Sequence, residues 1–259
     1  MKNSPIGIFD SGVGGTSIWK EICTLLPNED TIYLADSKNA PYGPKGKDSI
    51  INLSIKNTEL LLEMGCKLVV VACNTATTNA IDYLRTTYAI PFIGIEPAIK
   101  PAALKTSTNA VGILATKGTL SSALFSKTSN QFASNVTVIE QEGDGIVELI
   151  ESGQLHSSQM KDLLQCYIEP MLEAKIDHLV LGCTHYPYLT PILLEILPKG
   201  VKIIDSGEAV AKQTKAILEI NKLNNSERSI AKHQFYTNGS INILKQLIGD
   251  NYSISYLDF

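Results

Sequence analysis

Short apolar runs alternate with longer amphipathic segments along this chain, and the alternation predicts strands and helices in turn. The apolar runs predict strands at residues 6–9, 31–35, 68–71, 92–95, 110–114, 136–139, 178–181, 202–204, 234–236 and 252–256. The amphipathic segments predict helices at residues 15–26, 45–64, 75–88, 119–131, 143–152, 157–174, 188–197, 208–223 and 241–247, one more that starts at Pro97, and a polar turn at 224–228. Such alternation is typical of an α/β fold with mostly parallel sheets.

Three segments repeat between the two halves of the chain. Residues 7–11 align with 112–116 at an offset of 105, while 70–73 and 93–96 align with 180–183 and 203–206 at an offset of 110. The repeat predicts two pseudo-symmetric domains, each a mostly parallel sheet flanked by helices.

The repeat also places the site and the domain limits. Ligands of open α/β sheets bind at the carboxyl ends of the strands, so the active site is expected in the cleft between the domains. The segment after residue 207 has no counterpart and is expected to return to the first domain. The predicted domains are therefore 1–97 plus 207–259, which is discontinuous, and 98–206.

Two cysteines stand at matched positions in this repeat. Cys73 and Cys183 each follow a strand-like apolar run and precede a predicted helix. Unpaired N–H groups and the dipole at a helix start favour an anion, so both thiols are expected to have a lowered pKa. Two thiols on related half-sites predict one base on each face of a planar intermediate. Racemisation at carbon is the simplest reaction of this kind.

A metal site is the alternative interpretation of these cysteines. Cys73, Cys183 and His185 offer three ligands, but the usual zinc spacings of paired cysteines or paired histidines are missing. We therefore expect no metal.

Residues 10–15 form a glycine-rich turn after the first strand. A dinucleotide fingerprint would need glycine where Ser17 stands, and residues 43–48 lack the P-loop spacing, so no cofactor is expected. We interpret the turn as one whose N–H groups bind a carboxylate, with Asp10 facing the cleft. A simple tight turn is the alternative.

Other polar residues have structural interpretations as well. The loop 39–43 can be a plain turn, and Thr116 and Thr119 can cap a helix. By residue type alone, His185 is a satisfied surface histidine and Glu151 a solvated carboxylate.

Composition excludes several classes of function. The 259 residues are 44% hydrophobic and 19% charged, as in ordinary globular proteins. A net charge of −4 without a basic run predicts no nucleic-acid partner. No apolar run approaches the ~20 residues of a membrane helix and no signal peptide precedes the first strand, so a cytoplasmic location is expected. The five cysteines are expected to be reduced, with three of them small buried hydrophobes: Cys23, Cys66 and Cys166.

Taken together, the motifs resemble the glutamate racemases of the cofactor-independent aspartate/glutamate racemase superfamily. Residues 8–15, 40–43, 72–76 and 181–187 carry the resemblance, which covers nearly the whole chain. The aspartate racemases of the superfamily usually have a different glycine loop and an acidic residue where His185 stands.

The resemblance implies a role for each matched residue. Cys73 and Cys183 would be the proton donors and acceptors, Asp10 and His185 would assist them, and Glu151 would be a third auxiliary. The implied substrate-binding residues are Asp10, Ser11, Pro41, Tyr42, Gly43, Asn74, Thr75, Thr116, Thr119, Thr184 and His185. The family's Gly-Thr before the second-half helix is Ala115-Thr116 here, which keeps the hydroxyl.

The resemblance also implies the reaction, in which L-glutamate and D-glutamate interconvert by two-base proton transfer without a cofactor. D-glutamate would supply peptidoglycan, and homodimers are common in the family. The alternatives are an aspartate or other amino-acid racemase, and a non-catalytic two-domain ligand-binding protein. Such a binding protein would have no need of thiols at both strand ends.

Overall fold

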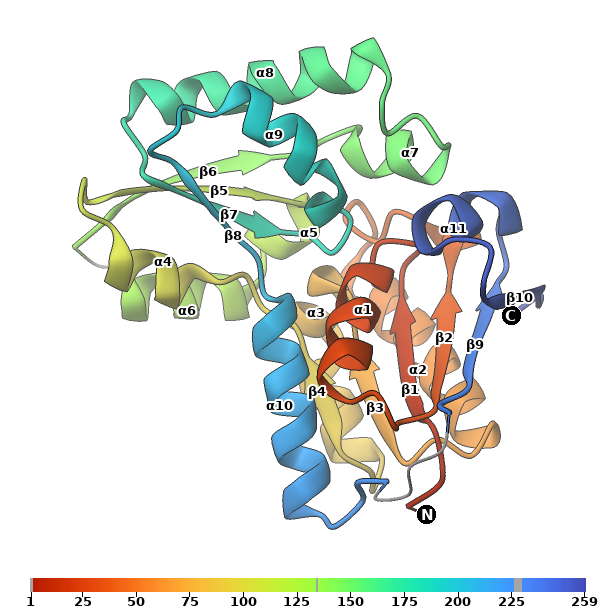
Figure 1. The fold of residues 1–259 in the computed structure, drawn as a ribbon. Coiled ribbons are helices and arrows are strands. Elements are labelled where there is room, and N and C mark those ends of the chain that lie inside the picture. The colour runs from red at the N-terminus through yellow and green to blue at the C-terminus, as the bar shows by residue number, and fades with distance from the viewer. Residues whose placement is uncertain (1, 134, 226–229) are drawn as a thin grey trace.

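The computed structural model describes residues 2–133, 135–225 and 230–259, and the strands of these residues form two parallel sheets (Figure 1). The first has the order β10 (Ser253–Tyr256), β9 (His233–Thr237), β2 (Thr31–Ala35), β1 (Ile6–Asp10), β3 (Leu68–Val71) and β4 (Phe92–Gly94). The second has the order β6 (Thr137–Glu142), β5 (Ala110–Ala115), β7 (His178–Gly182) and β8 (Lys202–Ile204). We call the two sheets with their helices the first half and the second half. The predicted α/β class is confirmed.

Helices cover both sheets. In the first half they are α1 (Thr16–Leu25), α2 (Lys47–Glu63), α3 (Asn74–Thr87), α10 (Gly207–Ile220) and α11 (Ile241–Ile248), with the 3-10 helix η1 (Ser37–Asn39). In the second half they are α4 (Ile99–Lys105), α5 (Lys117–Leu120), α6 (Ala123–Phe132), α7 (Ile146–Glu151), α8 (Ser158–Glu173) and α9 (Thr190–Ile196), with the 3-10 helix η2 (Tyr186–Leu189).

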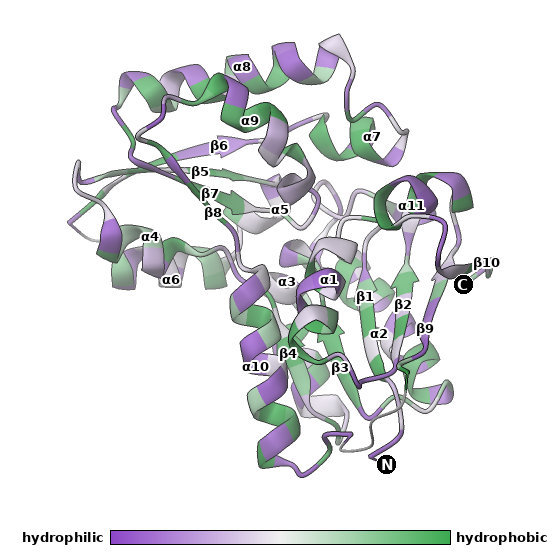
Figure 2. Ribbon diagram, viewed as in Figure 1, coloured by the Kyte–Doolittle hydropathy of each residue, from purple (hydrophilic) through white to green (hydrophobic). Residues whose placement is uncertain are grey.

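The central strands are apolar along most of their length because helices cover both of their faces. In β1, Ile6 and Ile8 belong to the core cluster that includes Trp19 of α1, while Phe9 belongs to the cluster that includes Leu61 of α2. Figure 2 shows the central strands β1, β3, β5 and β7 mostly in green and the helices beside them in alternating green and purple. These buried strands hold the strand-end loops in fixed positions.

The two halves share one strand order. β2-β1-β3-β4 in the first sheet corresponds to β6-β5-β7-β8 in the second, so the segments that align in the sequence occupy equivalent strands. The strands β9 and β10 extend only the first sheet. The division into domains near residues 97 and 207 stays a prediction.

The chain crosses between the halves twice, after β4 and after β8. The Ser206 hydroxyl donates to the Glu96 carbonyl, which ties the crossings together. Two further bonds join α1 to the second half: Ser17 Oγ donates to the Thr184 carbonyl over 2.8 Å, and Thr16 Oγ1 lies 2.6 Å from the Tyr188 hydroxyl. The halves therefore meet beside the strand ends.

Several predicted helix limits are wrong, each for a local reason. The predicted helix 119–131 is two helices, because Ser122 caps α6 by accepting a bond from the Phe125 N–H. The helix predicted from 143 starts at Ile146, since Gly145 has a left-handed φ of 77°. The helix predicted at 188–197 is η2 followed by α9.

Two further expectations concern other parts of the chain. The predicted polar turn reaches residues 226–228, which lie outside the described residues. No described helix has both the length and the apolar character needed to span a bilayer.

Candidate active site

A cavity of about 10 Å³ is lined by residues of both halves, and both Cys73 and Cys183 belong to its lining. Its other lining residues are Ser11, Pro41, Tyr42, Gly43, Asn74, Thr75, Thr116, Val147, Thr184 and His185. Apart from Val147 of α7, every lining residue follows the end of β1, β2, β3, β5 or β7. The predicted substrate-binding residues thus line one cavity, except Asp10 and Thr119.

Cys73 is the N-cap of α3. Its Sγ accepts a bond from the Ala76 N–H over 3.4 Å and lies 3.7 Å from the Ser11 hydroxyl. The expected lowering of its pKa is wrong, because burial, and then the nearby charge of Asp10, raise the pKa well above its usual value. Complete burial outweighs the helix start, and Cys73 is a thiol at neutral pH.

Asp10 is buried at the end of β1 and is held by donors from both halves. Its carboxylate accepts bonds from the N–H groups of Ser11 and Gly15, over 2.6 and 2.5 Å, and from Thr184 Oγ1 over 3.0 Å. Burial raises its pKa, although the nearby charge of His185 opposes the rise. Asp10 therefore connects the Cys73 side of the cavity with the Cys183 side.

Cys183, His185 and Glu151 form a chain of contacts. Cys183 Sγ lies 3.7 Å from His185 Nδ1, and His185 Nε2 lies 2.6 Å from Glu151 Oε1. Burial lowers the pKa of His185, but the hydrogen bonds to Cys183 and Glu151 outweigh burial and hold the pKa well above its usual value. The imidazole therefore lies between the Cys183 sulfur and the Glu151 carboxylate, and both favour its charged form.

Glu151 belongs to the second half but is fixed mainly by the first. Its Oε1 accepts a bond from the Val13 N–H over 2.6 Å, and its Oε2 accepts one from the Ser37 hydroxyl over 2.8 Å. The solvated carboxylate suggested by residue type alone is therefore wrong.

Three threonine hydroxyls join the halves on the other side of the cavity. Thr75 Oγ1 lies 2.8 Å from Thr116 Oγ1, which lies 3.1 Å from Thr119 Oγ1. Thr116 is the N-cap of α5 but makes no side-chain capping bond. The helix-cap interpretation of Thr116 is therefore wrong, and its hydroxyl faces the cavity.

Asn74 lines the same cavity with an unsatisfied side chain. Neither its Nδ2 nor its Oδ1 has a hydrogen-bond partner within the described part of the chain, although the side chain is buried. An unpaired buried amide costs about 1–3 kcal/mol. Its two polar atoms are therefore suited to a polar ligand.

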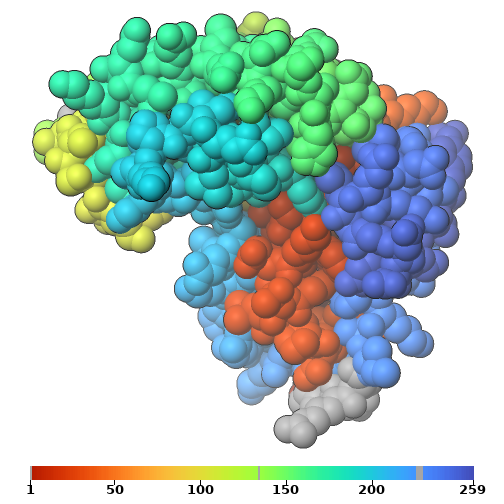
Figure 3. All heavy atoms as spheres, turned by 45° about the horizontal axis from the view of Figure 1, so that its top comes forward, coloured from red at the N-terminus to blue at the C-terminus, as the bar shows by residue number. Residues whose placement is uncertain are grey.

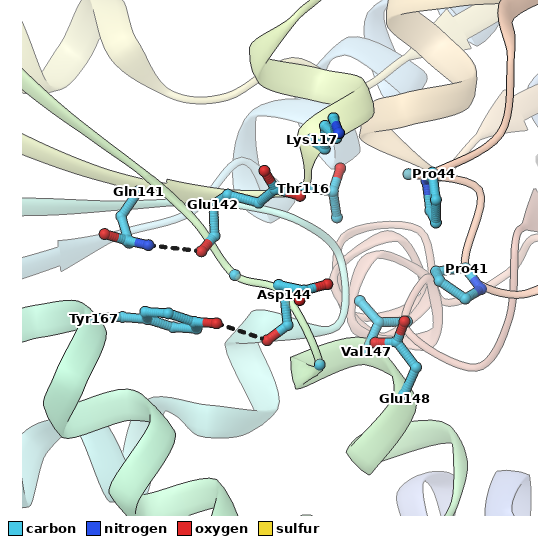
Figure 4. A pocket seen from close by; sticks show the side chains of 13 residues that line it. Pro41, Pro44, Thr116, Lys117, Gln141, Glu142, Asp144, Val147, Glu148 and Tyr167 are labelled. Carbon is cyan, nitrogen blue, oxygen red and sulfur yellow. Dashed lines mark hydrogen bonds between the residues drawn. The ribbon is translucent and has the colours of Figure 1, made fainter.

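A second cavity of about 410 Å³ adjoins the first (Figure 4). The two cavities share Pro41, Gly43, Thr116 and Val147. Figure 4 shows Pro41 and Pro44 of the first half across from side chains of the second half, so this cavity also lies between the halves.

The other cysteines lie outside this site. Cys66 is buried and Cys23 is partly buried, whereas Cys166 is exposed on α8, so the expectation that Cys166 is buried is wrong. No group of three or more His, Cys, Asp or Glu side chains among the described residues could hold a metal ion.

Sequence reasoning missed Ser37 and Val147. Ser37 is the second residue after β2, close to the carboxyl end of that strand, and this place near a strand end was a usable signal. Val147 lies on an amphipathic helix and carries no such signal.

Comparisons with known proteins agree on one family. Residues 14–214 match the family model described as Asp/Glu/Hydantoin racemase. A glutamate racemase of Herpetosiphon aurantiacus is 45% identical over 239 residues, which cover 92% of this chain and 94% of that protein. The crystal structure of the glutamate racemase isoform RacE1 from Bacillus anthracis matches with a TM-score of 0.89 at 30% identity, covering 100% of this chain and 98% of that one. An Escherichia coli glutamate racemase in complex with L-glutamate and the activator UDP-MurNAc-ala matches with a TM-score of 0.86 at 33% identity, covering 98% of each chain.

Proposed function

This chain belongs to the glutamate racemases of the Asp/Glu/hydantoin racemase family, and we propose that Cys73 and Cys183 carry out its interconversion of L-glutamate and D-glutamate. The observation that carries the proposal is that the two thiols come from opposite halves and line one cavity. One thiol on each side of a bound α-carbon is what a two-base racemase needs.

The two cysteines have complementary surroundings. Cys183 Sγ lies 3.7 Å from the His185 imidazole, whose pKa is raised, while burial raises the pKa of Cys73 and keeps it a thiol. The Cys183 thiolate removes the α-proton from one face and becomes a thiol. The Cys73 thiol then donates its proton to the opposite face of the planar intermediate and becomes a thiolate. The reverse reaction exchanges these roles.

The rest of the cavity binds and polarises the substrate. Loss of the α-proton places negative charge on the α-carboxylate, which donors at fixed positions stabilise. The donors in our proposal are the amide of Asn74, the hydroxyls of Thr75, Thr116 and Thr184, and the N–H groups after the strands. Asp10 does not line the closed cavity, but it contacts Thr184, which does, and its negative charge attracts the substrate ammonium.

Access to the site requires the halves to separate. A cavity needs about 10–15 Å³ to hold one water molecule, so the 10 Å³ cavity has no room for glutamate. The 410 Å³ cavity shares four lining residues with it and provides the route inward. Closure around the substrate then excludes water from the proton transfers.

Isotope exchange tests this function directly. In D₂O, with a chelator and no added cofactor, the protein is expected to convert L-glutamate and D-glutamate to a racemate and to place deuterium at the α-carbon. A binding protein cannot cause this exchange, so its absence with both enantiomers contradicts the proposal. Faster turnover of aspartate would assign a different substrate, and recovery of activity only on adding a metal would assign a different chemistry.

Gly14→Ala is expected to impair the site without unfolding the protein. A Cβ at Gly14 would lie 2.2 Å from His185 Nδ1, so the imidazole or the whole second half must move. Misplacing a reacting group by ~1 Å costs about 100-fold in rate, and we expect a loss of that order in kcat. Gly46→Ala is the matched control, since a Cβ there meets nothing within 4 Å. Equal kcat values for the two variants and the unmodified protein would contradict the described packing of His185.

The biological setting follows from the same proposal. The enzyme acts on a small-molecule substrate in the cytoplasm and supplies D-glutamate for peptidoglycan. The homodimer and the lack of a nucleic-acid partner stay predictions from the sequence.

A further inference from the structure

We propose that Ser37, held in place by the C-terminal segment, is a positioning residue for the Cys183 base. The inference rests on the proposed function, because it concerns how the His185 imidazole is held beside Cys183. Ser37 touches neither cysteine and does not line the cavity. It acts through Glu151.

The two oxygens of Glu151 have separate tasks. Oε1 contacts His185 Nε2 and the Val13 N–H, each over 2.6 Å. Oε2 accepts the Ser37 hydroxyl over 2.8 Å. The last torsion of a glutamate side chain is broad, so one anchored oxygen does not fix the plane of the carboxylate. Ser37 anchors the second oxygen and so fixes the direction in which Oε1 meets the imidazole.

The C-terminal segment in turn fixes Ser37. The Lys38 N–H donates to Asn238 Oδ1 over 2.9 Å, and Asn238 Nδ2 donates to Asp36 Oδ1 over 2.5 Å. These bonds hold the residues on either side of Ser37. Gly239 packs directly on Ser37, since a Cβ at Gly239 would lie 2.5 Å from the Ser37 Cβ.

Through this arrangement the C-terminal segment supports the Cys183 side of the site. The strands β9 and β10 extend only the first sheet, and the turn after β9 reaches Ser37. Figure 3 shows the blue C-terminal segment against both the red N-terminal part and the green second half. In agreement, a Cβ at Gly153 would lie 2.8 Å from Ile243 of α11. The segment thus lies where it can hold Ser37 against Glu151.

Ser37→Ala is the direct test. The hydrogen bond that it removes is to a charged group, and we expect kcat to fall about 10-fold, with KM within about twofold. Ser240→Ala is the matched control, because Ser240 is an exposed serine of the same segment whose side chain makes no capping bond. Gly239→Ala, which pushes Ser37 aside, is expected to reproduce the loss.

A double-mutant cycle distinguishes positioning from a general structural effect. If Ser37 acts through Glu151, then adding Ser37→Ala to Glu151→Gln lowers kcat by less than about twofold beyond Glu151→Gln alone. Losses that multiply would overturn the inference. So would a Ser37→Ala enzyme with the kcat of the unmodified protein while Glu151→Gln is slow. Failure of the proposed function has a different signature, since the unmodified protein would then not racemise glutamate at all.

Discussion

Cys73→Ala and Cys183→Ala are each expected to abolish the interconversion of L-glutamate and D-glutamate while the protein stays folded. Each thiol is the only base in our proposal on its face of the substrate, so its loss leaves one face without a proton donor. General acid–base groups contribute about 10²–10⁴ in rate, and removing the group that directly transfers the proton is expected to cost at least the upper end of that range. Chiral analysis of the products measures the loss, and circular dichroism verifies the fold.

Cys166→Ala is the matched control for both variants. The Cys166 thiol is exposed on α8 and lies outside the site, so the activity of the variant is expected to equal that of the unmodified protein. Each active-site variant keeps one of the two thiols and is expected to exchange the α-proton of only one enantiomer. The other variant is expected to exchange the α-proton of the opposite enantiomer. A single variant that still converts both enantiomers at nearly the normal rate would refute the two-base assignment.

Asp10→Asn and His185→Asn are expected to lower kcat by about 10²–10⁴. His185→Asn removes the contact with the Cys183 sulfur, and Asp10→Asn removes a charge that raises the pKa of Cys73 and that we propose attracts the substrate ammonium. The two directions should be affected unequally, because each thiol acts as the base in only one of them. Since the enantiomers have equal free energies, every variant has the same kcat/KM for the L-to-D reaction as for the D-to-L reaction. If kcat differs between the two directions, KM therefore differs by the same factor.

Steady-state kinetics from each enantiomer provide this measurement. Asp82→Asn and His156→Asn are the controls, because both residues are exposed and neither lines the cavity. Thermal unfolding separates a folding defect from a catalytic one. If both variants keep kcat within about twofold in both directions, Asp10 and His185 position the substrate and take no part in proton transfer.

The order of the elements could be predicted because the chain's central strands are buried on both faces. Such strands are continuous apolar runs, and they stand out from the amphipathic segments that cover them. Helix limits were less predictable, because they depend on single residues. The positive φ of Gly145 delays the start of one helix, and the capping hydroxyl of Ser122 divides another into two. The apolar pattern of both segments is continuous and does not show these limits.

The site residues that follow strand ends could be predicted from the sequence. The contacts formed where the two halves meet could not. Cys73 and Cys183 follow matched strands, so the sequence alone places each of them at the carboxyl edge of its own sheet. The contact of Ser37 with Glu151 joins residues 114 positions apart and requires the folded arrangement. The prediction for the pKa of Cys73 has the wrong direction because burial, which raises this pKa, is a property of the folded chain and not of the helix start alone.

Because the cavity has space for about one water molecule, each turnover in our proposal includes an opening and a closing of the two halves. Glutamate has to enter and leave past the same contacts that exclude water during proton transfer. Domain motions of this kind take microseconds to milliseconds and often limit kcat. Bonds between the halves, such as that from Ser17 to the Thr184 carbonyl, therefore favour proton transfer but slow product release. Stronger contacts between the halves hold the reacting groups more firmly but delay product release. The highest kcat is therefore expected when the contacts between the halves have intermediate strength.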